Sequence, residues 1–387
     1  MNKLLTRILA FIFLVMMVQS CTDEIEYIDK DYTDNEYDLI SKSLNLPISI
    51  HDYTPDFSNN SFSHLGGSQS LSKRTNHKAT LGRVLFYDTQ LSINNEISCA
   101  SCHKPELAFA DDVAFSEGFD GQLTTRNSLP LGNTIGFETA YGGSFSRAQF
   151  GWDESNHDIA SQSRAAILSE IEMGLDMFQL EQRLQNDEVY NVLFKKAYGE
   201  PGIQEHKILD ALEEFVNRIV SKNSRFDYES RNKENGIFES FDGFTEMENL
   251  GKELFNNNCG RCHSFDHTLT TKAVANNGLD IEYEDKGVGE RTGLLEDWGV
   301  FKVPFLRNIE LTAPYMHDGR FASLRDVIDH YSEGIQDHKN LDLELKKNGK
   351  PGNMNFTETE KQALEAYLKT LTDDSIAYEE KYADPFK

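Results

Sequence analysis

Cys99-Ala-Ser-Cys102-His103 and Cys259-Gly-Arg-Cys262-His263 are two copies of the pattern Cys-x-x-Cys-His, and they decide what this chain folds around. In each copy the two thiols can form thioethers with the vinyl groups of one haem, and the adjacent histidine can bind the iron. The two copies therefore predict two covalently bound haem c groups, one ligated by His103 and the other by His263.

One cysteine, Cys21, lies outside the two motifs, and it follows a leader-like N-terminus. Residues 1–20 carry Lys3 and Arg7 and then an apolar run over residues 8–18, which is the pattern of a secretory signal peptide. A transmembrane anchor is the alternative, but this run has only about half of the roughly 20 apolar residues that a spanning helix needs. We therefore expect cleavage before Cys21 and lipidation of its thiol, which gives an exported, membrane-anchored lipoprotein that faces the periplasm or the cell surface.

The chain is strongly acidic: 64 Asp and Glu residues against 38 Lys and Arg residues give a formal net charge of −26. This balance argues against nucleic acid as a partner, because the phosphate backbone would be repelled. Two interpretations of the charge stay open. It could steer a basic electron donor, such as a small cytochrome c with lysines around its haem edge, or it could serve only the solubility of an exported protein.

The composition changes along the chain and divides it into segments. Residues 21–77 are acidic at first and then rich in Ser, Asn and Gly, which predicts a polar tether, although Leu44 to Ile48 could pack on the body. The helical pattern begins just beyond this segment. We predict an N-terminal cytochrome c domain over residues 78–235 and a C-terminal cytochrome c domain over residues 236–387.

Helix signals surround both haem motifs. Leu81 and Val84 fall on one helical face shortly before the first motif. Thr245-Glu-Met-Glu248 is a capping-box pattern that opens a helix before the second motif, and Thr357-Glu-Thr-Glu360 opens another amphipathic helix near the C-terminus. Because strand signals are sparse, the predicted class is mainly α, with two cytochrome c-type domains that each hold one haem.

The order and spacing of several further strings resemble the bacterial dihaem cytochrome c peroxidases and the related MauG-type enzymes. The resemblance covers about Ala79 to Asp373. Besides the haem motifs, it is carried by Arg126-Asn127, Trp152-Asp153, Ile171-Glu172-Met173, Asn223-Ser-Arg225-Phe226-Asp227, Phe301-Lys-Val-Pro304-Phe-Leu-Arg307-Asn308 and Thr312-Ala-Pro-Tyr-Met-His317-Asp-Gly. It implies an enzyme in which the N-terminal haem cleaves hydrogen peroxide and the C-terminal haem accepts electrons. Family members are commonly dimers, so a homodimer is an allowed assembly.

The resemblance assigns roles to three residues. Glu172 falls where the family places an acidic residue over the open face of the N-terminal haem, where a carboxylate can take and return the protons of peroxide cleavage. Gln162 matches a pocket amide, and Trp152 matches a tryptophan between the two haems that offers an intermediate site for electrons. Taken alone, Glu172 and Gln162 would be ordinary helix-surface residues and Trp152 a core anchor.

The chain departs from the family pattern at Phe119. Many of the peroxidases have a histidine there, which blocks the N-terminal iron until the second haem is reduced. Phenylalanine cannot bind iron, and no other histidine occurs between His103 and His157. We expect an N-terminal haem that is ready for peroxide, with ligation by His157 through a rearranged loop as the competing interpretation.

The sixth ligand of the C-terminal haem is a second departure. Other members use a methionine, whereas the matching position, fourteen residues beyond His317, is Tyr331. Tyrosinate ligation, as in MauG-type enzymes, stabilises ferric iron and lowers its potential. His330 and Met354 are the alternatives, because each is a chemically competent ligand.

The resemblance implies three further contacts. Asn127, Thr312 and Pro314 match positions that hold a calcium ion through an amide oxygen, backbone carbonyls and water, which suits a hard cation. Arg307 is expected to pair with a haem propionate. His317 is expected at the domain interface rather than on iron.

Together these observations predict a dihaem cytochrome c peroxidase that reduces hydrogen peroxide to water with electrons from an external donor protein. A MauG-like oxidase, which acts on a protein or organic substrate, is the alternative within the enzyme class, and Phe119 and Tyr331 favour it. A dihaem electron carrier with two six-coordinate haems is the third interpretation, and Glu172 and Gln162 argue against it.

Overall fold

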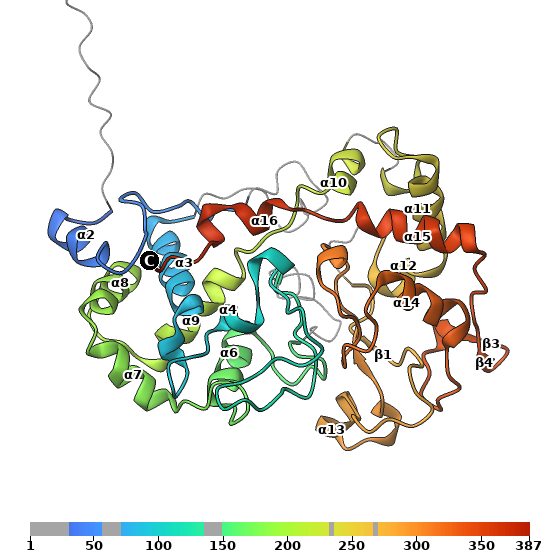
Figure 1. Cartoon of the computed structure of the whole chain (residues 1–387), viewed down its shortest axis with the longest axis horizontal. Coiled ribbons are helices and arrows are strands. Elements are labelled where there is room, and N and C mark those ends of the chain that lie inside the picture. The colour runs from blue at the N-terminus through green and yellow to red at the C-terminus, as the bar shows by residue number, and fades with distance from the viewer. Residues whose placement is uncertain (1–30, 56–70, 135–148, 232–235, 266–269) are drawn as a thin grey trace, which may run out of the picture.

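The computed structural model describes residues 31–55, 71–134, 149–231, 236–265 and 270–387, and the predicted leader and lipidated Cys21 lie outside these residues. The described chain forms two lobes that lie next to each other (Figure 1). The first lobe contains the described residues between 31 and 224 together with the C-terminal residues 375–387, and the second lobe contains those between 225 and 374.

The secondary structure is mainly α-helical, as the sequence predicts. The helices of the first lobe are α2 (Asp34–Ile40), α3 (Lys73–Tyr87), α4 (Cys99–Cys102), α6 (Ile159–Leu168), α7 (Met177–Gln185), α8 (Glu188–Tyr198), α9 (Glu205–Val216) and α16 (Ser375–Tyr378). Those of the second lobe are α10 (Arg225–Ser230), α11 (Glu246–Asn258), α12 (Gly260–His263), α13 (Val288–Thr292), α14 (Leu324–Asp329) and α15 (Glu358–Lys369). Short 3-10 turns are η2 (Thr89–Leu91), η3 (Pro105–Leu107), η4 (Gly236–Phe238), η5 (Leu295–Asp297), η6 (Ile309–Leu311), η8 (Leu343–Leu345) and η9 (Glu380–Tyr382), and η7 (His330–Gly334) is a single π-helical turn.

Strands are few in the described residues and short. β1 (Val274–Ala275) pairs antiparallel with β2 (Phe301–Lys302), and β3 (Lys346–Lys347) pairs antiparallel with β4 (Lys350–Pro351). The second pair forms a small hairpin that extends from the end of the second lobe (Figure 1). None of the described helices is long and apolar enough to cross a membrane.

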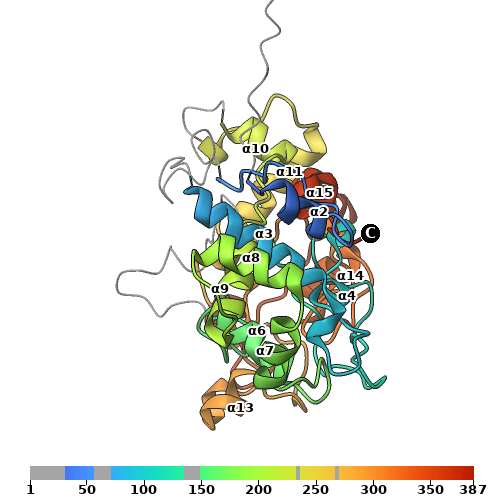
Figure 2. The ribbon, with the colours of Figure 1, turned by 90° about the vertical axis from the view of Figure 1, so that its left-hand side faces the viewer.

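Both lobes are built around the same helix crossing, in which a glycine lets two helix backbones touch. In the first lobe, a Cβ atom at Gly82 of α3 would lie 1.8 Å from the carbonyl oxygen of Ala211 in α9. In the second lobe, a Cβ atom at Gly251 of α11 would lie 1.9 Å from the carbonyl oxygen of Ala363 in α15. Figure 2 shows α3 beside α8 and α9. In each lobe the crossing fixes the helix that precedes the haem motif.

The two predicted capping boxes are confirmed. Thr245 accepts from the Glu248 backbone while the Glu248 carboxylate accepts from the Thr245 backbone, and Thr357 and Glu360 exchange the same two bonds. These reciprocal bonds satisfy N–H groups that the first turn leaves without partners. They set where α11 and α15 begin, and therefore where the crossing helices of the second lobe lie.

Over residues 31–55 the chain is docked on the first lobe, which confirms the expected packing of Leu44 to Ile48 and extends it beyond that stretch. Tyr32, Ile40, Leu44, Leu46 and Tyr53 are all buried in the core of the first lobe. Burying these five apolar side chains stabilises the docked segment, because each removes apolar surface from water. The part of the tether from residue 31 to residue 55 therefore belongs to the folded body.

The C-terminus also differs from the predicted boundaries, because it leaves the second lobe and returns to the first. Ile376 and Tyr382 are buried in the first-lobe core. The Tyr87 hydroxyl donates to the carbonyl of Tyr382 (2.6 Å), and Arg83 Nε donates to the carbonyl of Ala383 (2.6 Å). The last residues thus strap the two lobes together.

Candidate functional site

The first Cys-x-x-Cys-His motif places its histidine in a fixed orientation. Cys99 and Cys102 stand at the two ends of α4, and His103 follows directly. The imidazole Nδ1 of His103 donates to the carbonyl of Phe109 (2.9 Å), and burial lowers the pKa of this histidine. A neutral ring that donates through Nδ1 keeps a lone pair on Nε2, which is the atom an iron would need.

The second motif repeats this arrangement. The Nδ1 atom of His263 donates to the carbonyl of Pro304 (3.1 Å), and burial lowers the pKa of His263 to about 4. Burial also raises the pKa of Cys259 to about 12, and all four motif thiols are free of disulfide bonds. Both motifs therefore fit a haem c group, since each offers two protonated thiols and one oriented imidazole.

A cavity opens beside the second motif, and it brings together several residues that the sequence singled out. Among its lining residues are Cys259, Cys262, His263, Asn127, Trp152, Thr312, Pro314, His317, Tyr331 and Met354. Much of the remaining wall is apolar, with Phe255, Phe301 and Leu368 as examples. A largely apolar cavity beside the oriented His263 suits a flat hydrophobic ring system.

Tyr331 lies in the π-helical turn η7, which continues directly from α14. Single π turns occur frequently at functional sites. Burial raises the pKa of Tyr331 to about 12, although a hydrogen bond with Asn277 acts in the opposite direction. Met354 lies beside it, because the Met354 backbone N–H donates to the carbonyl of Tyr331 (3.2 Å). Two of the three predicted candidates for the sixth ligand thus line the same cavity.

His330, the third candidate, is occupied elsewhere. Its Nε2 atom donates to the carbonyl of Asn277 (3.0 Å), and its ring packs on Phe321 at a centroid distance of 5.7 Å. It is not among the residues that line the cavity. His330 therefore supports the position of η7 rather than facing the site.

Trp152 lies between the two motifs and is held at both ends. Its indole Nε1 donates to the carbonyl of Asn127 (2.8 Å), and its own carbonyl accepts from the backbone N–H of Lys302 (2.8 Å). Ser128, the neighbour of Asn127, donates to the carbonyl of Cys102 (2.8 Å). Lys302 in turn lies two residues before Pro304, which orients His263. A chain of hydrogen bonds and short backbone segments therefore connects the two motifs through Trp152.

The structure adds a buried ion pair that sequence reasoning missed. Lys302 Nζ lies 3.5 Å from the Glu154 carboxylate and also donates to the carbonyl of Gln149 (2.7 Å). Burial lowers the pKa of Lys302 and raises the pKa of Glu154. The only hint in the sequence was Lys302 itself, which stands inside the Phe301–Asn308 string.

Glu172 lies close to the first motif, in the turn that follows α6. Its carboxyl group is partly buried and has no hydrogen-bond or ion-pair partner among the described residues, and burial raises its pKa. The Glu172 charge adds to the burial that raises the pKa of Cys99 to about 12 and of Cys102 to about 11. The structure thus places an available carboxyl group within electrostatic reach of both thiols of the first motif.

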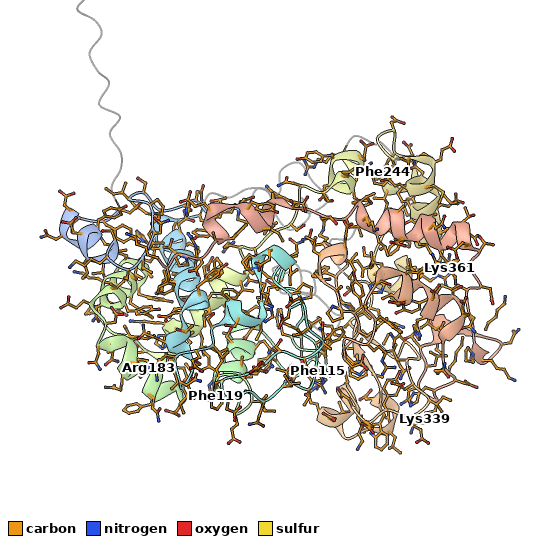
Figure 3. All side chains as sticks on the ribbon, viewed as in Figure 1. Phe115, Phe119, Arg183, Phe244, Lys339 and Lys361 are labelled. Atoms are coloured by element: carbon orange, nitrogen blue, oxygen red, sulfur yellow. The ribbon has the colours of Figure 1, made fainter. Side chains whose placement is uncertain are left out.

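The loop that contains Phe119 packs onto the Glu172 turn. The Phe119 backbone N–H donates to the carbonyl of Glu172 (3.0 Å), and a Cβ atom at Gly174 would lie 2.5 Å from the Phe119 ring. Figure 3 labels Phe119 in the first lobe. His157, the competing ligand for the first iron, is exposed to solvent. Phe119 has no imidazole, and the exposed His157 does not pack against the first motif.

Gln162 lies in α6 and faces the turn of residues 151–156, which contains Trp152. Its amide oxygen accepts from Asn156 (2.9 Å), and a Cβ atom at Gly151 would lie 3.4 Å from the same oxygen. Gln162 is partly buried. The described contacts tie it to the 151–156 turn, and none of them links it to Glu172.

Arg307 has a different partner from the one expected. Its guanidinium donates twice to Asp227, at 2.8 Å to each carboxylate oxygen, and both side chains are almost fully buried. This bidentate pair holds α10 in place within the second lobe. The contact of Arg307 with a haem propionate stays a prediction.

The residues of the expected calcium site have other contacts in this structure. The Asn127 side-chain amide donates to the carbonyls of Val113 (3.1 Å) and Ala114 (3.4 Å). Thr312 and Pro314 lie in the cavity wall. Within the described residues no group of three or more His, Cys, Asp or Glu side chains could hold a metal ion. A calcium site here would depend on amide and carbonyl oxygens alone.

Comparisons with known proteins agree with these features. A family model described as di-haem cytochrome c peroxidase matches residues 76–235. The chain is 31% identical over 307 residues to the methylamine utilization protein MauG of Methylorubrum extorquens, which covers 78% of this chain and 80% of that protein. It is 30% identical over 301 residues to the cytochrome c551 peroxidase of Nitrosomonas europaea, which covers 76% and 80%. The crystal structure of a MauG-like protein associated with microbial copper homeostasis matches with a TM-score of 0.67 at 30% identity, covering 88% of this chain and 98% of that one.

Proposed function

The chain belongs to the bacterial dihaem cytochrome c peroxidase and MauG family, and from this premise we propose that it reduces hydrogen peroxide to water at the first motif with electrons received at the second. Two haem c groups would be held by Cys99, Cys102 and His103 and by Cys259, Cys262 and His263. Each haem supplies, when bound, an iron centre that takes up and passes on electrons. The protein supplies ligation, proton handling and a route between the sites.

The observation that carries the proposal is the state of Glu172. Cleavage of peroxide needs a group that takes a proton from one oxygen and gives one to the other. A carboxyl group without a partner, and with a raised pKa, can do both at a pH not far above its own pKa. Its position beside the first motif makes Glu172 the proposed acid and base of the reaction.

We propose further that the first site is open to peroxide in the oxidised protein. Phe119 has no donor atom for iron, and the exposed His157 is directed to solvent rather than to the motif. An open site needs no prior reduction of the second haem. Gln162, which lies in α6 and accepts a hydrogen bond from Asn156 of the turn beside Trp152, is proposed to complete the polar part of the pocket.

For the second site we propose Tyr331 as the sixth ligand. The oxygen of Tyr331 already has a hydrogen bond with Asn277, which favours its anionic form. A ferric iron would lower the pKa of the phenol further, because metal binding competes with the proton. Met354, in the same cavity wall, is the alternative ligand.

We propose that electrons pass between the sites by way of Trp152. The supporting geometry is the path from His103 through Ser128 and Asn127 to Trp152, and from there through Lys302 to Pro304 and His263. Its hydrogen bonds are between 2.8 and 3.3 Å long. Trp152 is nine-tenths buried, so its redox state is protected from solvent.

A MauG-like oxidase is the second candidate function. An open first site and a tyrosinate at Tyr331 would favour oxidation of a protein or organic substrate over simple peroxide turnover. Export as a lipoprotein through Cys21, a calcium ion at Asn127 and a homodimer stay predictions of the sequence.

Electron paramagnetic resonance of the fully oxidised holoprotein tests the proposal directly. We expect one high-spin ferric signal, which disappears at once when hydrogen peroxide is added without reductant. Two low-spin signals that do not respond to peroxide would contradict the open first site. Consumption of a protein substrate, with little peroxide turnover in the presence of donors, would favour the oxidase.

A further inference from the structure

Lysines gather at one end of the second lobe, although the chain as a whole is strongly acidic. The β3–β4 hairpin carries Lys346, Lys347 and Lys350 within five residues. Lys346 Nζ donates to the carbonyl of Lys339 (3.3 Å), which brings a fourth lysine to the same place. We call these four residues the lysine patch.

The lysines of the patch are not tied up in ion pairs. Lys339, Lys347 and Lys350 are exposed, and no ion pair with a carboxylate is formed by any of the four among the described residues. Lys361, on the same lobe, behaves differently, because it pairs with Asp329 (2.7 Å) and Glu333 (2.9 Å). Figure 3 labels Lys339 and Lys361 on the second lobe. The patch thus presents three exposed ammonium groups, at Lys339, Lys347 and Lys350, that have no ion-pair partner among the described residues.

Apolar side chains are exposed next to the patch. Leu343 is 81% exposed and Leu295 is 57% exposed. Asn340 connects the two segments, because its side-chain amide donates to the carbonyls of Leu295 (2.7 Å) and Trp298 (3.0 Å). Lys339 Nζ lies 5.1 Å from the centroid of the Trp298 ring. Exposed apolar groups beside charged ones are typical of a protein docking surface.

The patch lies on the outer side of the second haem motif. Asp342 and Leu345, at the two ends of the segment that carries Leu343, line the cavity beside Cys262. Arg261, which stands between the two cysteines of the motif, pairs with Glu344 (2.8 Å). A protein that docks on this segment would therefore approach the edge of the second site.

We infer that the lysine patch and Leu343 dock the acidic face of a small electron-carrier protein. The inference rests on the proposed function, since it names the partner of the second site. A haem held by Cys259, Cys262 and His263 would accept the one electron that such a carrier loses in each encounter. Because charges in physiological salt are screened over about 8 Å, a docked partner senses these lysines rather than the net charge of −26.

Binding of a redox-inert probe tests the inference without depending on turnover. The probe is cadmium-substituted plastocyanin, whose docking face is acidic, and its dissociation constant from the holoprotein is measured by titration calorimetry at a physiological ionic strength of about 0.15 M. We expect K347E/K350E to weaken binding at least about ten-fold and K347Q/K350Q to weaken it less. The matched control is K42E/K195E, which makes the same change in net charge at exposed first-lobe lysines and should change the constant less than about two-fold.

Equal weakening by the hairpin and control variants would overturn the inference, because only total charge would then matter. Tighter binding of a lysine-rich cytochrome c than of plastocyanin would overturn it as well. Peroxide consumption with hydroquinone, a small neutral reductant, is measured in parallel. Its absence in the unmodified protein would contradict the proposed function, whereas its presence together with an unresponsive hairpin would contradict the docking surface alone.

Discussion

Lys302 and Glu154 form an ion pair beside Trp152, with 3.5 Å between the ammonium and the carboxylate and with side chains only 5% and 9% exposed. The two residues are 148 positions apart in the sequence. Lys302 also donates its backbone N–H to the Trp152 carbonyl, so the pair fixes the tryptophan between the two motifs. The ion pair, the two candidate haem sites and the helix crossing of the second lobe each lead to a prediction.

The first concerns the ion pair itself. Glu154→Gln removes the carboxylate charge that faces the buried Lys302 ammonium, and breaking a buried pair in this way costs about 3 kcal/mol. We expect a lower denaturant midpoint for the holoprotein. The double variant E154Q/K302M should recover much of the loss, because it removes both charges. A double variant as unstable as the single one would show that the charges are not coupled.

The second concerns Glu172. Glu172→Gln should reduce the second-order rate constant for hydrogen peroxide about 10²- to 10⁴-fold, because the side chain can no longer take a proton. Glu170→Gln, at an exposed position two residues earlier, is the matched control and should leave the rate unchanged. In the unmodified protein the rate should fall as the pH drops through the raised pKa of Glu172, since the protonated carboxyl cannot act as the base.

Stability should move in the opposite direction to activity in this variant. A carboxyl with a raised pKa in the folded protein binds its proton more tightly there than in the unfolded chain. Stability is therefore lost as the pH rises from the unfolded to the folded pKa. Glu172→Gln removes that loss, so its melting temperature at pH 7 should be equal to or above that of the unmodified protein. A clear fall would mean that Glu172 has a structural partner.

The third concerns the sixth ligand of the second haem. Tyr331→Phe removes the phenolate, and we expect the reduction potential of that haem to rise on the order of 100 mV, because axial ligands set haem potentials. Met354→Leu should leave the potential and the ferric spectrum unchanged. The reverse pattern, with a response only to Met354→Leu, would assign the ligand to methionine. Spectroelectrochemical titration of both variants decides between them.

The fourth concerns the helix crossing of the second lobe. Gly251→Ala places a methyl group where the Ala363 carbonyl lies, so α11 and α15 must separate. We expect a loss of about 2 kcal/mol in the free energy of unfolding. Gly132→Ala is the control, since an added Cβ there has open space around it. Equal stability of both variants in chemical denaturation would contradict a tight crossing.

Local sequence patterns predicted the haem motifs, the helix starts and the mainly α class of this protein. The haem motifs are five residues long, and the capping boxes at Thr245 and Thr357 depend on residues three positions apart. Interactions of this range are fixed as soon as a helix forms, so sequence patterns report them directly. The mainly α class and the neighbourhood of each histidine follow from the same short-range information.

Contacts between residues that are far apart in the sequence could not be predicted from local patterns. The pair of Arg307 with Asp227, 80 positions earlier in the chain, is an example: folding buries both side chains together and each then needs the other's charge. The predicted tether failed over residues 31–55 for a similar reason. The sequence indicated packing only for Leu44 to Ile48, whereas Tyr32, Ile40 and Tyr53 are scattered among polar residues, and only the first-lobe core shows that they have a surface to pack against.

The sequence alone determined that two Cys-x-x-Cys-His motifs sit in a helical, acidic chain with a carboxylate at Glu172 and no histidine at Phe119. Only the tertiary structure decided that Tyr331 and Met354 line one cavity. It also decided that Lys302 pairs with Glu154 and that the lysines of the β3–β4 hairpin lie outside the second motif. The physical reason is the distance along the chain over which each interaction acts. Helix formation and capping act over a few residues, whereas desolvation and charge pairing depend on which distant segments the packed cores bring together.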